Sequence, residues 1–303
     1  MTRRTVRYIV LLLLAALTEQ AAAQTGSAGL QFLKLGVGAR ALAMGEAYSA
    51  IATDPSATYY NPAALSLVTS PRILLMHKEW IQGTRTEFIG ATSRTGDFSF
   101  GLSANSTSVD NIELRSVPGP ALGTFDARNA SIGLSGSYAF SPEFSAGMTM
   151  KYLYEKIYVY DASGLAFDFG GVYKTPWDVT LALAVNNLGS LSELDKESST
   201  LPASIRGGAG YERDLEQLDS RLTLSTDIVS FTVEQKSHVH VGAELTYKET
   251  FSARAGYQTG YDAKSFSAGV GIRYDIVALD YAYVPFQVDL GTTHTFSIGI
   301  NFE

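Results

Sequence analysis

Cysteine is absent from this chain of 303 residues, which excludes a disulfide framework, a thiolate metal site and a lipoprotein anchor. Charged residues are scarce, at 17%, whereas soluble domains carry about 25%. The net charge of -7 argues against a nucleic-acid partner. After residue 23, no apolar run approaches the length of about 20 residues that a transmembrane helix needs. The lack of such a run excludes a helical membrane protein.

The first residues are typical of a secretory signal peptide. Arg3, Arg4 and Arg7 precede an apolar run over 8–17, and small residues follow at 21–23. The apolar run is too short to stay in a bilayer as a spanning helix. We therefore predict that residues 1–23 are a signal peptide, that cleavage follows Ala23, and that the protein is exported.

Alternation of apolar residues with small or polar ones fills most of the remaining chain. In one run, Val239, Val241, Leu245 and Tyr247 lie at alternate positions. Because successive side chains of a strand point to opposite faces, each such run is predicted to be a strand with one apolar face. Fourteen runs show this pattern: 72–80, 84–94, 97–106, 127–140, 143–155, 161–174, 178–187, 203–211, 219–229, 237–247, 250–257, 264–274, 276–284 and 293–302.

The strand ends distinguish a soluble sandwich from a membrane barrel. Connections after even-numbered strands are mostly tight, whereas the longest ones, near 107–126 and 188–202, follow odd-numbered strands. Aromatic rings with the outward parity close both ends of the predicted strands. They are Tyr138, Tyr173, Tyr211, Tyr247, Tyr274 and Phe302 at the tight turns, and Trp80, Tyr152, Tyr154, Tyr257, Tyr281 and Tyr283 at the other end.

Two aromatic girdles, with short turns on one rim and longer loops on the other, are typical of outer-membrane barrels. We therefore predict an all-β fold for residues 71–303, a 14-stranded antiparallel transmembrane β-barrel surrounded by the lipid of the bacterial outer membrane. An even strand count returns both termini to the periplasm.

The inward positions of the predicted strands carry charged side chains, which should pair in a confined lumen because an unpaired charge there is costly. A paired network would stiffen the wall and hold a plug; alternatively, the same side chains would form the selectivity lining of a pore. They are Lys151, Asp168, Arg206, Arg221, Asp227, His238, His240, Glu244, Arg254, Arg273 and Asp280.

Two of these residues, His238 and His240, share a strand face as a metal-binding pair does. No third ligand is apparent, so we expect both imidazoles to hydrogen-bond to lumen carboxylates. A G-x-S-x-G motif is also missing, since residues 133–137 lack its final glycine. The sequence therefore predicts no enzyme, no metal and no cofactor.

Residues 24–70 show no strand periodicity, and we call this segment the hatch. Asp54-Pro55 and Asn61-Pro62 each place a capping side chain before a proline, which predicts two short helical turns. Small residues dominate, so the hatch can pack as a plug inside the lumen. Its motif residues are Gly36, Gly38, Arg40, Gly45, Asp54, Asn61 and Pro62.

Two blocks of the hatch, 33–45 (LKLGVGARALAMG) and 54–65 (DPSATYYNPAAL), resemble the opening of PorV/PorQ family proteins. The blocks 280–286 (DYAYVPF) and 290–294 (LGTTH) are similar to the same family near its C-terminus. The resemblance covers essentially the whole mature chain. It implies a fourteen-stranded barrel related to the fatty-acid transporter FadL, whose hatch also carries an Asn-Pro-Ala element.

The resemblance implies a non-enzymatic accessory of type IX secretion that receives cargo carrying a C-terminal signal domain. Its partners would be the secretion translocon, the cargo signal domains and the barrel-assembly machinery. The alternative is a FadL-like channel that takes up small hydrophobic compounds, which requires an apolar pocket between hatch and wall. Inward glycines at 170, 208, 210, 269 and 271 would either leave room for a plug or allow such an opening.

Overall fold

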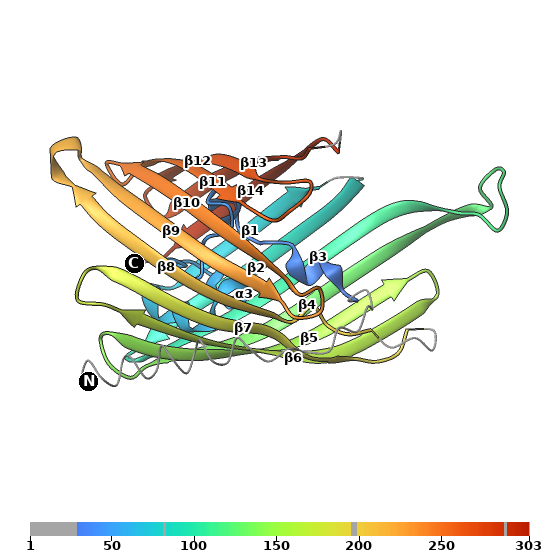
Figure 1. The fold of residues 1–303 in the computed structure, drawn as a ribbon, viewed down its shortest axis with the longest axis horizontal. Helices are drawn as coiled ribbons and strands as arrows, with labels where there is room; N and C mark the ends of the chain where they lie inside the picture. The colour runs from blue at the N-terminus through green and yellow to red at the C-terminus, as the bar shows by residue number, and fades with distance from the viewer. Residues whose placement is uncertain (1–28, 81–82, 195–198, 288–289, 303) are drawn as a thin grey trace.

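The computed structural model describes residues 29–80, 83–194, 199–287 and 290–302, and shows a closed barrel of fourteen antiparallel strands (Figure 1). Each strand pairs with its neighbours in the sequence, and β1 closes the barrel on β14. The predicted all-β, 14-stranded antiparallel barrel is therefore confirmed. The predicted signal peptide lies outside the described residues. The strands are β1 Arg72–Glu79, β2 Thr84–Thr95, β3 Phe98–Leu114, β4 Gly123–Ala139, β5 Phe144–Ile157, β6 Tyr160–Lys174, β7 Val179–Leu191, β8 Ser204–Leu215, β9 Ser220–Phe231, β10 Lys236–Tyr247, β11 Phe251–Gln258, β12 Phe266–Tyr274, β13 Val277–Pro285 and β14 Thr292–Asn301.

The two ends of the barrel differ in their connections. One end, which we call the turn rim, holds the links from each even strand to the next odd strand, such as 96–97 and 275–276. The other end, the loop rim, holds the remaining links, such as 115–122 and 259–265. Strand β1 begins at the turn rim, so the hatch leads into the barrel wall from that end.

The prediction of a long loop near 107–126 is wrong. Strands β3 and β4 continue to Leu114 and from Gly123, so that the hairpin projects beyond its neighbours (Figure 1). Its register shifts between Val109 and Ile112, and Asn111 between them has φ 58°. This bulge interrupts the two-residue period in the sequence, although the strand goes on. A second register shift, beside Asp168, precedes the extension of β7 to Leu191 beyond its predicted end at 187.

The outer surface of the barrel is apolar over most strands. Val241, Ile272 and Ile298 are 42%, 43% and 44% exposed on β10, β12 and β14, whereas inward neighbours such as His240 and Ser297 are buried. The pattern changes near the loop rim of β1 and β2, where two polar side chains have the outward parity and His77 Nδ1 lies 2.5 Å from the Glu87 carboxylate. The apolar band is therefore shorter on these two strands.

The core of the protein lies inside the barrel, between the hatch and the inner wall. Tyr48, Tyr60 and Leu65 of the hatch are fully buried and pack in one cluster with wall residues that include Met76 and Phe88. Within the described ranges, no helix has the length and apolar character needed to cross a membrane. The helices are short: η2 Gln31–Lys34, α2 Ala39–Ala43, α3 Ala57–Tyr60 and η3 Pro62–Leu67 in the hatch, and η5 Glu216–Leu218 at the turn rim.

Candidate functional site in the barrel lumen

Asn61 stands at the start of η3 and joins the hatch to the wall. Its Oδ1 accepts from the Ala63 backbone amide at 3.0 Å, and Pro62 follows at the first helical position. Its Nδ2 donates to the carbonyls of Ser49 at 3.2 Å and of Gly171, on β6, at 3.3 Å. Because Asn61 is fully buried, each of these bonds replaces one with water.

Asp54 does not cap a helix in the way that the sequence suggested. Helix α3 begins at Ala57 with Ser56 in the N-cap position, and no side chain caps it. The Asp54 carboxylate instead accepts from the Ser56 amide at 2.8 Å, and its other oxygen accepts from the Tyr48 hydroxyl at 2.5 Å. Asp54 therefore closes a turn two residues before the helix, a geometry that its side chain favours as strongly as a cap.

Two glycines of the hatch motif flank α2 and allow this hatch helix to pack closely against the wall. Gly38, with φ 83°, is the residue before the helix, and its amide donates to the Met76 sulfur at 3.0 Å. Gly45, with φ 63°, lies directly against the wall, where a Cβ would stand 2.9 Å from the Tyr257 amide nitrogen. A larger side chain at either position would strain the backbone or displace α2.

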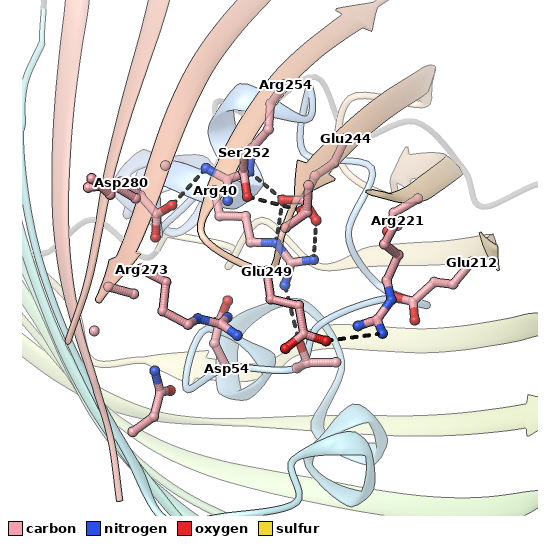
Figure 2. A pocket seen from close by; sticks show the side chains of 18 of the residues that line it. Arg40, Asp54, Glu212, Arg221, Glu244, Glu249, Ser252, Arg254, Arg273 and Asp280 are labelled. Atoms are coloured by element: carbon pink, nitrogen blue, oxygen red, sulfur yellow. Dashed lines mark hydrogen bonds and ion pairs between the residues drawn. The ribbon is translucent and has the colours of Figure 1, made fainter. Parts of the chain in front are cut away.

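An ion chain joins α2 to three wall strands (Figure 2). Arg40 donates to Glu244 of β10 from Nε at 2.9 Å and from Nη2 at 2.6 Å. The same carboxylate contacts Arg254 of β11, whose Nη1 donates to Asp280 of β13 at 2.7 Å. Four residues predicted for the hatch motif or the lumen network therefore lie in one continuous chain.

A second group holds the turn after α2. Asp227 of β9 accepts from the backbone amides of Tyr48 and Ser49 at 3.2 and 3.1 Å, and from Arg206 of β8 at 2.9 Å. Arg206 also donates to the Glu46 carbonyl at 2.9 Å. The Arg206–Asp227 pair on the wall thus hydrogen-bonds to the hatch backbone, and the side chains of Arg206 and Asp227 are more than nine-tenths buried.

Lys151 and Asp168 form a third buried pair, at 2.6 Å, on β5 and β6. Lys151 also donates to the side-chain oxygen of Asn187 at 2.9 Å, and the backbone amide of Asn187 donates to the Asp168 carboxylate at 2.7 Å. The register shift beside Asp168 brings Asn187 into this arrangement. The pair therefore stabilises a wall irregularity as well as the lumen.

Contrary to expectation, the two lumen histidines contact no carboxylate of the residues that the structure describes. His238 is within 3.2 Å of the Thr259 carbonyl and stacks on Tyr261 with ring centroids 3.8 Å apart. His240 is within 3.2 Å of the Tyr261 hydroxyl. Tyr261 lies in the β11–β12 loop, which folds over both rings, and the strand pattern gave no sign of this. No group of three metal-binding side chains occurs among the described residues.

A cavity of about 920 Å³ lies between the hatch and the turn rim. Arg40 and Asp54 line it from the hatch, and most other lining side chains are polar or charged (Figure 2). Arg273 is exposed in this cavity and has no ion-pair partner among the described side chains. Arg221 pairs with Asp214 at 2.7 Å on the rim itself. These two arginines therefore lie outside the buried network in which they were expected.

A second cavity, of about 430 Å³, lies between the hatch and the loop rim. Apolar residues from both sides line it: Leu35, Leu42, Trp80, Phe231, Val284 and Phe286. The outward orientation predicted for Trp80 is therefore wrong, because Trp80 shares the inward parity of Met76 and Lys78 and faces the lumen. Helix α2 separates the two cavities, because Arg40 lines one and Leu42 the other. Lys78 also lines this cavity and was not predicted as a lumen residue, although it shares the inward parity of Leu74 and Met76.

Glu46 and Lys264 form an ion pair at 2.9 Å inside the loop-rim cavity. Burial alone would raise the pKa of Glu46, but Lys264, His240 and Arg206 together outweigh it, and the pKa falls from 4.5 to about 2. The pair joins the hatch to the β11–β12 loop, so this charge is part of what holds the hatch in place.

Comparison with known proteins identifies a family for the chain. The sequence matches the uncharacterised protein family UPF0164 over residues 13–166, which is just over half of the chain. The protein belongs to UPF0164. No curated protein matches its sequence. The UPF0164 match neither supports nor contradicts the resemblance to PorV/PorQ proteins, which stays a prediction.

The fold of this UPF0164 protein is similar to that of several solved channels. The monoaromatic hydrocarbon channel CymD superimposes with a TM-score of 0.64 at 11% identity, over 91% of this chain and 99% of CymD. The toluene transporter TodX of Pseudomonas putida gives 0.62 at 13%, over 87% and 96%. A Pseudomonas aeruginosa FadL homologue gives 0.51 at 14%, over 88% and 97%. At these identities the likeness shows the fold.

Proposed function

We propose that this protein is an outer-membrane channel for small hydrophobic compounds. The observation that carries the proposal is the pair of cavities on opposite sides of α2, inside one closed barrel. Most of the surface that lines the loop-rim cavity is apolar, although charged side chains line it as well, whereas polar and charged side chains dominate the lining of the turn-rim cavity. An apolar compound would enter the first cavity and leave through the second once the hatch shifts.

The fold neighbours support this choice of compound class, since two of them are described as hydrocarbon or toluene channels. The proposal places the turn rim in the periplasm and the loop rim outside the cell, as is usual for outer-membrane barrels. The protein would bind and move the compound without changing it chemically.

A tethered hatch tests the proposal. The Ala39 amide donates to the Ser297 hydroxyl at 2.9 Å, so the two residues are in contact, and we choose the double variant A39C/S297C for a disulfide between hatch and wall. The chain has no other cysteine. We expect proteoliposomes with a lipopolysaccharide outer leaflet and the oxidised double variant to take up labelled ethylbenzene no faster than protein-free vesicles of the same composition. Reduction should restore uptake, and each single variant serves as a control.

Uptake that continues through the oxidised variant, or that the unaltered protein fails to support, would reject the channel. The tether locks α2 against β14 without removing any charge of the network, so the barrel wall stays as it is. Intact mass measurement reports whether the disulfide has formed.

The secretion accessory implied by the PorV/PorQ resemblance remains a second candidate. The projecting β3–β4 hairpin favours it, because Val117 and Leu122 at the tip are 70% and 71% exposed beyond the neighbouring strands. Such a tip would offer an apolar contact to a cargo signal domain outside the cell. Retention of a type IX signal domain by the unaltered protein, and loss of retention in the variant V117S/L122S, would support this role.

A further inference from the structure

The loop-rim cavity combines an apolar lining with ionisable groups whose pairing is incomplete. Lys34 pairs with Glu234 at its edge, and Lys264 pairs with Glu46. Lys264 also lies 4.6 Å from the ring centre of Tyr261. Each of these lysines therefore has a carboxylate partner within the described residues.

Lys78 is different. Its side chain is on β1, is 3% exposed and lines the same cavity. An ammonium group has three hydrogens to donate, yet the bond found for Lys78 goes to a neutral acceptor, the Gly36 carbonyl, at 2.9 Å. No carboxylate of the described residues lies within 4.0 Å of it. Glu46 lines the same cavity but forms its ion pair with Lys264. A buried cation without an ion-pair partner of its own is costly, so the position of Lys78 favours a negatively charged ligand beside it.

Two hydroxyl groups beside Lys78 point to the same conclusion. Thr293 lines the cavity, is 3% exposed, and its hydroxyl has no hydrogen-bond partner among the described residues. Thr295 is fully buried, lies opposite Lys78 across the β1–β14 pairing, and its hydroxyl also lacks a partner there. Buried hydroxyls normally find a partner, so a polar group of a ligand is expected beside them.

The size and lining of the cavity restrict the rest of the ligand. Its volume of about 430 Å³ is near the lower end for ligand pockets. Trp80 and Phe286, whose ring centres are 6.2 Å apart, form part of its apolar wall. This space suits one ring with a short substituent.

We propose that the loop-rim cavity binds a small monocarboxylate with an apolar body, whose carboxylate contacts Lys78 and Thr293 while its ring packs against Trp80 and Phe286. The inference deepens the proposed function, because it assigns to the entry cavity an anionic amphiphile in place of a neutral hydrocarbon. The remaining ammonium hydrogens of Lys78 serve the ligand, and Gly36 keeps its bond.

Tryptophan fluorescence gives a direct test. The chain has two tryptophans, and Trp177 is 77% exposed at the turn rim, far from this cavity. In the W177F protein in detergent, Trp80 is therefore the single reporter. The probes are 4-ethylbenzoate and 4-ethylbenzamide, which match in shape and differ in charge. We expect the benzoate to quench Trp80 and to bind about tenfold more tightly than the amide, or better, since a hydrogen bond to a charged group accounts for that difference.

Three further variants assign the preference to Lys78. In K78M the two probes should bind equally. In K78R, which keeps the positive charge and the fold, the benzoate should stay preferred. Lys236 is exposed and also lines the cavity. The variant K236M therefore removes a nearby charge but leaves Lys78 in place, and it should keep the full preference for the benzoate.

Equal binding of the two probes by the W177F protein would overturn the inference, as would no binding of either, or a preference that survives K78M. These outcomes are separate from the test of the channel. Ethylbenzene uptake that stops in the oxidised tether, together with equal binding of the probes, would leave the channel standing and remove its anionic ligand. A preference for the benzoate that depends on Lys78, found together with no ethylbenzene uptake, would keep the anionic ligand and reject the channel.

Discussion

Arg40 in the hatch and Glu244 in the wall are joined by two hydrogen bonds, from Nε to Oε2 at 2.9 Å and from Nη2 to Oε1 at 2.6 Å. This geometry matches the planar guanidinium to the planar carboxylate. Glu244 also contacts Arg254, so one buried acid holds two cations. The pair ties the one helix that separates the two cavities to strand β10.

Replacing Glu244 with glutamine should loosen the hatch. Two guanidinium groups would lose their shared anion, and breaking a buried pair in this way costs roughly 3–5 kcal/mol. We expect the variant to unfold at lower temperature in detergent and to raise ion conductance in planar bilayers. The matched control is E249Q, since the Glu249 side chain is 81% exposed on the turn rim and its loss should change neither value. Conductance in E244Q equal to that of the unaltered protein would show that the pair does not hold the hatch.

Asn61 should matter for stability more than for conductance. Replacement with alanine removes the cap of η3 and leaves the carbonyls of Ser49 and Gly171 without their donor. The expected loss is about 1–3 kcal/mol, because the partners stay buried and unsatisfied. Urea unfolding in detergent measures it, with S116A on the exposed β3–β4 loop as the control. A midpoint that does not move would mean that the η3 cap contributes nothing.

Acid should weaken the hatch through Glu46. Burial would raise its pKa, but the groups around it, Lys264 foremost, lower it to about 2 in the folded protein, against 4.5 ordinarily. A lowered pKa contributes stability that is complete above about pH 4.5 and is lost as the pH falls towards 2. Unfolding temperatures should therefore drop between pH 5 and pH 2.5, and the drop should be smaller in E46Q. Identical pH profiles for the two proteins would exclude this contribution.

The barrel could be predicted from the sequence because its evidence is local. Alternation along single strands and aromatic residues at their ends each require only nearby positions, and they placed every strand end within four residues of where it lies except that of β3, which continues to Leu114 and not to 106. The bulge at Asn111 was missed, since an extra residue shifts the period while the strand continues.

The lumen was less predictable because its contacts join distant parts of the chain. Parity placed Glu244 and Arg254 inside, but nothing in the sequence joined them to Arg40, two hundred residues earlier. Parity would also have placed Lys78 inside. Its importance depends on which partners the other elements fail to supply, and that is visible only in three dimensions. The partners of His238 and His240 come from a loop without periodicity.

The central claim is that the barrel stands in lipid with the hatch enclosed in its lumen, and spin labels test it directly. Val241, Ile272 and Ile298 are 42%, 43% and 44% exposed on the outer face, whereas Ser225 and Ser297 are 6% and 3% exposed on the inner face. In proteoliposomes, labels at the three outer positions should relax with oxygen dissolved in the lipid and be protected from a water-soluble nickel complex. Labels at the two inner positions should show low accessibility to oxygen. Outer labels that respond to the nickel complex and not to oxygen would contradict the account.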